Sequence, residues 1–409
     1  MEKSAVSARP GVKKFTAFGA AAGAIALPLA VGAADWELNP SVEAGYLFDD
    51  NYRLAMPGNE VEVQGPLVDA QLEMRARTPS GGEFSFTPRV HATYFPDATD
   101  LDAVDYYGDL YWLHQGQRLR TEVRGEAAQQ DVVSSEQPDA QVPGDASLGE
   151  GDTGGSGVVL IDNRRTRFAV RPDFSYELSP RRALEFGANV VDVSYENEVP
   201  GAQVDYRYGD VTAGLVMQVS PTSSFTTRVR GAQYELDFQG DSTSYGVELE
   251  WGTRNAAETQ TFVRGGAQRV DFEAGGSVTA WLAGGGVSMV RGRNQLFADL
   301  VRSVGPSSSG IVITRDQLRF RWTRDLTPRL SFLAGVRGTH DEDVNQDQQA
   351  LRPRSYATGD IGLQWRWQEE FALRVTADYT WQKFQAAPSD ATSSGALVSI
   401  LYQPLQRRR

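Results

Sequence analysis

The sequence contains no cysteine, so disulfide bonds and thiolate chemistry are excluded. Past residue 34 it has no run of 18 or more apolar residues, which excludes a helical membrane span in the remainder of the chain. Positive charge is also scarce, because the 409 residues carry a formal net charge of −13. A broadly basic nucleic-acid-binding protein is therefore disfavoured.

The one apolar stretch lies at the N-terminus. Lys13 and Lys14 precede an apolar segment, 15–31, and small residues follow up to Ala34. This order is typical of a secretory signal peptide. We predict that residues 1–34 are a signal peptide, cleaved after Ala33 or Ala34, with an uncleaved anchor helix as the alternative.

Removal of residues 1–34 makes the chain more acidic. The segment holds four basic residues and one acidic residue, so residues 35–409 keep 36 basic and 52 acidic residues, a net charge of −16. Only Lys383 survives among the lysines, and the remaining positive charge is arginine. The preference for arginine over lysine has two explanations. The coding sequence is rich in G and C, or the planar guanidinium serves as a rigid hydrogen-bond donor to carboxylates and sugars in a pore.

What the sequence does contain is two-residue alternation, as in FALRVTADYTW (371–381). Val375 and Tyr379 fall on one face, and Arg374 and Asp378 fall on the other. Successive side chains of a β-strand point to opposite faces. The segment therefore predicts a strand with one face in lipid and the other in water.

Similar segments recur to the end of the chain, and their connectors alternate between short turns such as LSPR (178–181) and longer, mostly acidic loops. The predicted strands are 36–48, 67–77, 83–95, 104–114, 118–130, 163–177, 182–196, 204–219, 224–238, 244–253, 258–272, 277–290, 294–304, 311–325, 330–339, 354–367, 371–385 and 394–404. An even number of strands joined alternately by short turns and long loops is typical of an outer-membrane barrel. The predicted fold is all-β, a transmembrane antiparallel up-and-down β-barrel over 35–409 with about 18 strands; the alternative is 16, because the pattern is weakest over 277–313.

The strand at 182–196 changes phase. Its apolar positions run through Leu184, Phe186 and Val190, and then shift to Val191 and Val193. A β-bulge near Val190 explains this, as does a strand that leaves the membrane, where alternation is no longer enforced.

A soluble β-sandwich also alternates, but three features favour the barrel. The strands are longer than those of soluble sheets. Aromatic residues gather near strand ends, as Trp365, Trp367 and Phe371 do around one tight turn. The signal peptide delivers the chain to the periplasm of a Gram-negative bacterium, and in lipid only closure removes unpaired strand edges.

The segment DWELNPSVEAGYLFDDNYRLA (35–55) resembles the start of outer-membrane β-barrel porins found with exosortase (PEP-CTERM) and exopolysaccharide loci. In those chains a first strand is followed by a Tyr and an Asp-Asn pair, here Tyr46, Asp50 and Asn51. Residues 189–237 are similar to their Tyr-rich central strands. The resemblance implies an outer-membrane location and a role in polysaccharide export, and it brings no catalytic residues. One departure is the C-terminus, where Tyr402 is followed by a tri-arginine tail instead of ending the chain.

The predicted inner face is charged with both signs. It stiffens the interior through cross-strand ion pairs, or it forms a polar conduit that selects solutes; both readings hold together. The candidate lumen-lining residues are Arg75, Arg89, Arg120, Arg165, Arg167, Arg228, Arg319, Arg321, Arg366, Arg374, Glu73, Glu122, Asp360 and Asp378.

The longest loop is 131–162, with seven acidic residues and no basic one. It is interpreted either as a solvated surface loop or as a constriction folded into the channel. The acidic segment 341–347 lacks the glycine and final glutamate of a calcium loop. No metal site and no cofactor are therefore predicted.

Enzyme chemistry is not predicted, because no nucleophile motif such as G-x-S-x-G occurs. Among the three histidines, His340 beside Asp341 is the one candidate for a general base with an orienting carboxylate. The predicted function is an outer-membrane channel or scaffold that serves exopolysaccharide export. The alternatives are a plugged structural barrel and an outer-membrane hydrolase. Expected partners are outer-membrane lipids, lipopolysaccharide, the barrel-assembly machinery and polysaccharide-export components, and no nucleic acid.

Overall fold

The computed structural model describes residues 34–137, 159, 162–199, 202–236, 240–255, 258–344, 354–385 and 387–404. The chain divides into Met1–Ala34 and Asp35–Arg409. The predicted signal peptide lies outside the described residues, so its cleavage stays a prediction. The strands are β1 (Asp35–Asp49), β2 (Val63–Arg77), β3 (Gly82–Thr93), β4 (Ala103–Gln115), β5 (Leu119–Asp131), β6 (Arg164–Ser179), β7 (Arg182–Tyr195), β8 (Tyr206–Ser220), β9 (Ser223–Leu236), β10 (Ser242–Arg254), β11 (Thr259–Phe272), β12 (Ser277–Arg291), β13 (Asn294–Ser307), β14 (Ile311–Thr327), β15 (Leu330–Asp343), β16 (Arg354–Arg366), β17 (Phe371–Phe384) and β18 (Ala391–Tyr402).

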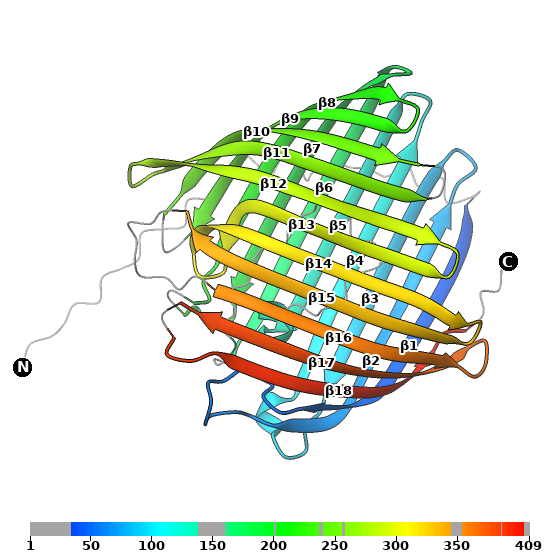
Figure 1. The fold of residues 1–409 in the computed structure, drawn as a ribbon, viewed down its shortest axis with the longest axis vertical. Coiled ribbons are helices and arrows are strands. Elements are labelled where there is room, and N and C mark those ends of the chain that lie inside the picture. Colours follow the sequence, from blue (N-terminus) through cyan, green and yellow to red (C-terminus); the bar gives the residue numbers. More distant parts are fainter. Residues whose placement is uncertain are drawn as a thin grey trace, which may run out of the picture. The chain divides into compact units, whose positions relative to one another are not determined.

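These strands form one closed antiparallel barrel. Each strand pairs with its sequence neighbours, and β1 pairs with both β2 and β18 (Figure 1). The described residues thus contain an 18-stranded sheet without a free edge strand, which confirms the predicted fold class. The only helices among them are a 3-10 turn, η2 (Thr99–Leu101), and α1 (Val132–Glu136). None of the described helices is long and apolar enough to cross a membrane.

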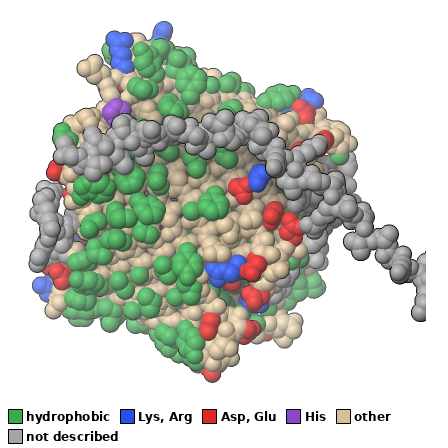
Figure 2. All heavy atoms as spheres, turned by 180° about the vertical axis from the view of Figure 1, so that it is seen from behind, with side chains coloured by type: hydrophobic (Ala, Val, Ile, Leu, Met, Phe, Trp, Pro, Cys, Tyr) green, Lys and Arg blue, Asp and Glu red, His purple; other side chains and the backbone are tan. Residues whose placement is uncertain are grey.

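The outer wall is apolar. Along β17, Val375 and Tyr379 are 45% and 53% exposed, whereas Thr380 between the outward positions is buried. Hydrophobic side chains run in rows over the wall seen in Figure 2, and most charged side chains in that view lie toward one end. At the tight-turn end, Trp367 stacks on Phe371 at 5.9 Å between ring centroids, and Phe371 lies 4.9 Å from Tyr402. Amphipathic rings in this position suit a membrane interface.

Most strands extend one to four residues past the predicted ends, and the extensions are greatest at the long-loop end. There β2 begins at Val63 instead of 67, and β15 continues to Asp343 instead of 339. The weakly patterned segment 277–313 forms β12, β13 and the start of β14. Pairing outlasts the apolar alternation because backbone hydrogen bonds form whatever the side chains are, whereas only lipid requires the outward side chains to be apolar.

The predicted bulge near Val190 is absent. The β6–β7 register runs unbroken through Val170↔Val190, and β7 pairs with β8 without a shift. Instead Val191 and Val193 point to the inner face, where each is 1% exposed. The phase change therefore marks the height at which the barrel interior becomes apolar.

Candidate functional site

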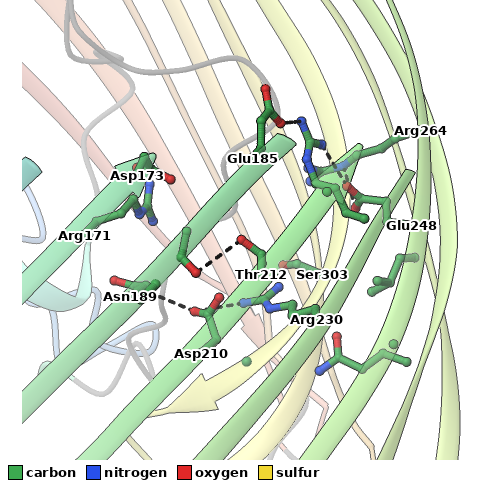
Figure 3. A pocket seen from close by; sticks show the side chains of 18 of the residues that line it. Arg171, Asp173, Glu185, Asn189, Asp210, Thr212, Arg230, Glu248, Arg264 and Ser303 are labelled. Carbon is green, nitrogen blue, oxygen red and sulfur yellow. Dashed lines mark hydrogen bonds and ion pairs between the residues drawn. The ribbon is translucent and has the colours of Figure 1, made fainter. Parts of the chain in front are cut away.

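A charged cavity of about 590 Å³ lies inside the barrel wall formed by β5 to β14 (Figure 3). Its described lining includes eight arginines and six carboxylates. The charged residues are Arg120, Arg124, Arg171, Arg228, Arg230, Arg264, Arg302, Arg315, Glu122, Asp173, Glu185, Asp210, Glu248 and Glu250. Arg302 borders the cavity but also pairs with Glu342 on the outer face, and the other seven arginines still outnumber the six carboxylates, so this cavity of an acidic chain carries an excess of positive charge.

Arg228 of β9 meets three carboxylates of the cavity lining. Its Nη1 lies 2.8 Å from Glu250 Oε2 and 3.3 Å from Glu248 Oε1, and its Nη2 lies 3.5 Å from Glu185 Oε2. Arg264 also reaches Glu248 at 3.5 Å. The network spans β7 to β11, so its charges are held by cross-strand neighbours instead of by one strand.

A second network lies nearer the long-loop end. Arg230 Nη2 lies 3.3 Å from Asp210 Oδ2 and also contacts the Tyr208 hydroxyl. Asn189 donates to the same carboxylate oxygen of Asp210 at 3.3 Å. Gln268 donates to the Tyr234 hydroxyl at 3.1 Å. Hydrogen bonds between these buried groups hold their side chains in position on the wall.

The predicted lumen residues Arg120, Glu122 and Arg228 line this cavity. Most of the others form ion pairs elsewhere. Arg89 meets Asp69 at 2.6 Å, and Arg374 meets Glu43 at 3.1 Å. The remaining pairs are Arg75 with Glu73, Arg167 with Glu126, and Arg319 with Asp299.

The remaining predicted lumen residues differ in their burial and contacts. Arg165 is buried and donates to the Ser135 carbonyl at 3.3 Å. Asp360 is buried, Arg321 and Asp378 are half-buried, and Arg366 is exposed beside a tight turn. A conduit lined by the fourteen predicted residues stays a prediction.

The described start of the longest loop folds inward. Asp131 caps α1 by accepting a hydrogen bond from the Val133 backbone N–H at 2.7 Å. Val132 and Val133 are buried, and Val159 from the far side of the loop is 1% exposed. These residues favour the constriction over the solvated loop; 138–158 and 160–161 lie outside the described residues.

Glu136 ends α1 and is fully buried inside the barrel. Its Oε1 accepts from the Tyr195 hydroxyl at 2.7 Å, and its Oε2 accepts from the Ser308 hydroxyl at 3.2 Å. Arg354 donates to the Glu136 carbonyl at 3.1 Å. The sequence marks Glu136 only as one of seven acidic loop residues, because its partners lie 59 and 172 residues away.

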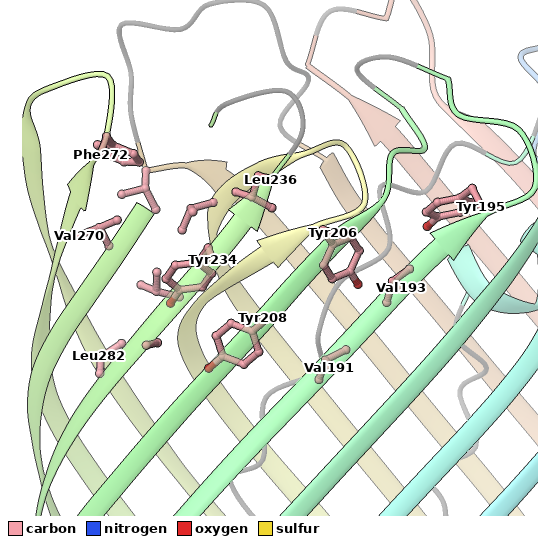
Figure 4. Packing of buried hydrophobic residues seen from close by; sticks show 14 of the residues in the cluster. Val191, Val193, Tyr195, Tyr206, Tyr208, Tyr234, Leu236, Val270, Phe272 and Leu282 are labelled. Carbon is pink, nitrogen blue, oxygen red and sulfur yellow. The ribbon is translucent and has the colours of Figure 1, made fainter. Parts of the chain in front are cut away.

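The connection between β13 and β14 also enters the barrel (Figure 4). Val304 and Val312 pack in one buried cluster with Tyr234 and Leu236 of β9. Figure 4 shows the hairpin over the wall that carries the labelled Tyr234 and Leu236. At its tip, the Ser308 carbonyl accepts from the Val204 backbone N–H at 2.9 Å. The hairpin and α1 together narrow the long-loop end.

A further loop covers this end near β1. Tyr52 packs edge-on against Phe95 at 5.2 Å, and its carbonyl accepts from Gln137 Nε2 at 3.3 Å. Burial raises the pKa of the Tyr52 hydroxyl, and the nearby carboxylates of Asp131 and Asp105 raise it further. The tyrosine therefore stays protonated and neutral at ordinary pH.

The His340–Asp341 pair, the one candidate for a general base with an orienting carboxylate, does not form. Asp341 is buried and accepts two hydrogen bonds from Arg315, at 2.6 and 2.7 Å. His340 Nδ1 instead lies 2.9 Å from Ser355 Oγ, and its Nε2 lies 3.5 Å from Glu342 Oε1. Adjacent strand residues point to opposite faces, so these two side chains do not meet. Among the described residues, no cluster of three or more His, Asp or Glu side chains is suited to hold a metal ion.

The geometry defines the class: a closed, lipid-compatible barrel with a charged interior narrowed at one end. No protein-family model matches the chain, and no curated protein matches it. Pseudomonas aeruginosa OccK2 (OpdF), solved in complex with glucuronate, is similar with 12% identity and a TM-score of 0.46 over 91% of this chain and 99% of its own. P. aeruginosa OpdK with vanillate is similar at 13% identity and a TM-score of 0.46 over the same shares. Similarity at this level carries nothing about function.

Proposed function

We propose that this protein is an outer-membrane channel for small polar solutes, with a preference for anions. The single observation that carries the proposal is the cavity with eight arginines and six carboxylates inside a barrel whose outer wall is apolar. Opposed charges held on fixed strands orient a solute, and the arginine excess lowers the barrier for an anion. Outer-membrane lipids and lipopolysaccharide are the proposed surroundings, and the barrel-assembly machinery is the proposed insertion partner.

Conductance tests the proposal. The purified barrel, in planar bilayers with a KCl gradient, should show stepwise conductance and a reversal potential that indicates anion preference. Arg228→Gln leaves its three glutamates without this cation, so the preference should move toward cations. Arg207→Gln is the matched control, because Arg207 is 62% exposed and pairs with Asp192 away from the cavity. A barrel without steps, or without the Arg228 effect, contradicts the proposal.

Exopolysaccharide export is the finer form of this proposal, and only the resemblance of 35–55 and 189–237 supports it. A polysaccharide chain would have to pass the junction between Glu136 and Ser308, which now crosses the interior. Deletion of the gene in its own host, followed by measurement of secreted polysaccharide, tests this form. Unchanged secretion would remove it and leave the channel proposal intact.

A hydrolase is the second candidate, favoured by the chain of contacts from Ser355 through His340 to Glu342. All three side chains face outward near the long-loop end, where an acyl ester of a lipid could reach them. The 3.5 Å separation of His340 and Glu342 exceeds an ordinary hydrogen bond, so the channel is preferred. Ester hydrolysis that disappears in both Ser355→Ala and His340→Ala would reverse this order.

A further inference from the structure

We infer that the β13–β14 hairpin, residues 303–314, is a gate that takes two positions. In the inner seat it lies inside the barrel, and in the wall seat it lies in the wall beside β12. The inference rests on the proposed channel function. In the structure the hairpin occupies the inner seat, where Val304 and Val312 cover the Tyr234 side of the cavity. The wall seat is the place where strand pairing in the wall has a gap.

The gap lies between β12 and β13. Their pairing runs from Arg291↔Asn294 only as far as Ala283↔Arg302. Beyond that point, Ser277–Leu282 of β12 pair only with β11, and the remaining residues of β13 pair only with β14. In Figure 1 the β11–β12 hairpin projects beyond its neighbours at this end.

The two unpaired edges match in length and register. If the pairing Ala283↔Arg302 is continued, Leu282 falls opposite Ser303, and Ser277 falls opposite Ser308. Six residues of β12 therefore face six residues of the hairpin with no shift of register. Return of the hairpin to the wall would close the gap and remove the hairpin from the cavity.

The sequence allows the hairpin to pair with β12 but makes that pairing weak. Hydrogen-bond alternation along β13 turns Val304, Pro306 and Ser308 toward β12. Pro306 has no N–H to donate, as is usual for a proline on a strand edge. At Gly305, an added Cβ atom would meet no other atom within 4 Å, so the bend is not packed on that side.

Contacts at both ends hold the inner seat. At the tip, Ser308 bonds to Glu136 through its hydroxyl and to Val204 through its carbonyl. At the branch point, Arg302 lies 4.2 Å over the Trp281 ring and donates to Asp316 at 2.8 Å. Residues 303–314 carry no charged side chain, so a membrane potential does no direct work on the tip.

Cysteine trapping tests the gate, because the chain has no cysteine of its own. In the wall seat, Val278 and Ser307 become a directly opposed pair that does not exchange hydrogen bonds, with Cα atoms about 4.5 Å apart. This spacing suits a disulfide. The variant Val278→Cys/Ser307→Cys, in lipid vesicles under mild oxidation, should therefore form a disulfide detectable by loss of free thiols and by mass spectrometry of peptides.

The matched control is Val278→Cys/Ser308→Cys. It removes the Ser308 hydroxyl from Glu136 and thus frees the tip, but a one-residue shift puts the two sulfurs on opposite faces of the wall. We expect no disulfide in this control. Adding Glu136→Ala to Val278→Cys/Ser307→Cys should raise the disulfide yield, because it removes the hydrogen bond that holds Ser308 in the inner seat. Oxidised channels should conduct roughly twice as well as reduced ones or better, since the hairpin then leaves the conduction path.

The outcomes separate the gate from the channel. No in-register disulfide, or equal yields in the two pairs, overturns the gate and leaves the channel proposal untouched. A disulfide in register without conductance in either redox state overturns the channel and keeps the hairpin movement. A disulfide that leaves conductance unchanged shows that the hairpin moves but does not gate.

Discussion

Pairing stops early at two places in the wall, and the two are built differently. Along β1–β18, where the barrel closes, pairing covers Val42–Asp49 against Gly395–Tyr402, and within the described part of the chain, which ends at Pro404, it leaves Asp35–Ser41 without a β18 partner. Along β12–β13 it leaves Ser277–Leu282 without a β13 partner. The first gap lies at the tight-turn end, and the second lies at the long-loop end.

The β1–β18 seam is braced where it reaches the long loops. The Asp50 carboxylate accepts from the Ser394 backbone N–H at 2.7 Å, and the buried Asn51 amide donates to the Thr392 carbonyl at 2.8 Å. The Asp-Asn pair on which the resemblance rests thus has a structural task here. At its other end the seam stops two residues short of a proline pair, because Pro40 and Pro404 would face each other without an N–H.

The β12–β13 junction has no such brace in the described residues beyond Arg302. Beyond Arg302, β13 stays paired with β14, and the resulting hairpin turns inward and packs on buried tyrosines. The contrast indicates that one gap is a terminus of pairing and that the other is an exit for a hairpin. Variants that affect one region and spare the other test this distinction.

The largest effect is expected for Tyr234→Ala. The Tyr234 side chain is 0% exposed beneath the hairpin, and large-to-small changes of buried aromatics cost about 3–5 kcal/mol. Tyr46→Ala is the matched control at the seam, since Tyr46 is 52% exposed on the outer wall. Urea unfolding in lipid vesicles should show a much greater loss for Tyr234→Ala, and equal losses would mean that the hairpin cluster stabilises nothing.

Next in size is Arg302→Ala at the branch point. Loss of the bond to Asp316 and of the Trp281 contact should destabilise the barrel by about 2 kcal/mol; the pair with the half-exposed Glu342 adds little. Arg207→Ala, which breaks an exposed pair, should cost less than about 1 kcal/mol. Faster hydrogen exchange in 303–314 for Arg302→Ala alone checks the assignment of Arg302 as the base of the hairpin.

The wall of the barrel was predictable from sequence because lipid imposes a period of two on each strand. FALRVTADYTW and its relatives need no distant partner to show which face meets lipid. The extra residues of β2 and β15 escaped prediction, since beyond the lipid the backbone pairs without demanding apolar side chains. Strand count and order therefore followed from local pattern, and strand ends did not.

The interior was harder to predict. Arg228 and Glu122 fall on the polar phase, so their placement on the inner face follows from alternation alone. Glu136, Tyr195 and Ser308 meet only because three distant segments turn into the same space. The shift of apolar phase at Val191 was the available signal, and the bulge interpretation of that shift was wrong.

A smaller effect is expected when the proline pair of the seam is removed. Pro40→Ala/Pro404→Ala restores two N–H groups that face each other across β1 and β18, which favours pairing by about 1 kcal/mol. Loss of proline rigidity in the unfolded chain opposes this by a similar amount, so stability should change by less than about 1 kcal/mol. The informative measurement is amide exchange at position 40, which should be protected in the double variant and less so in Pro40→Ala alone.

The smallest effect is expected at Asp390, just before β18. Hydrogen bonds from Trp381 Nε1, at 3.0 Å, and from the Lys383 ammonium hold the pKa of the Asp390 carboxyl below its usual range. A carboxylate with a lowered pKa in the folded state stabilises the fold above its unfolded-state pKa, and this contribution is lost as pH falls through the lower, folded value. Asp390→Asn should therefore reduce the dependence of the urea midpoint on pH in that acidic window and leave the midpoint at neutral pH nearly unchanged, because an exposed pair contributes little. An equal reduction in Asp271→Asn, which breaks an exposed pair with Arg269 beside the β12 gap, would show that the effect is general surface charge and not the attachment of β18 to β17.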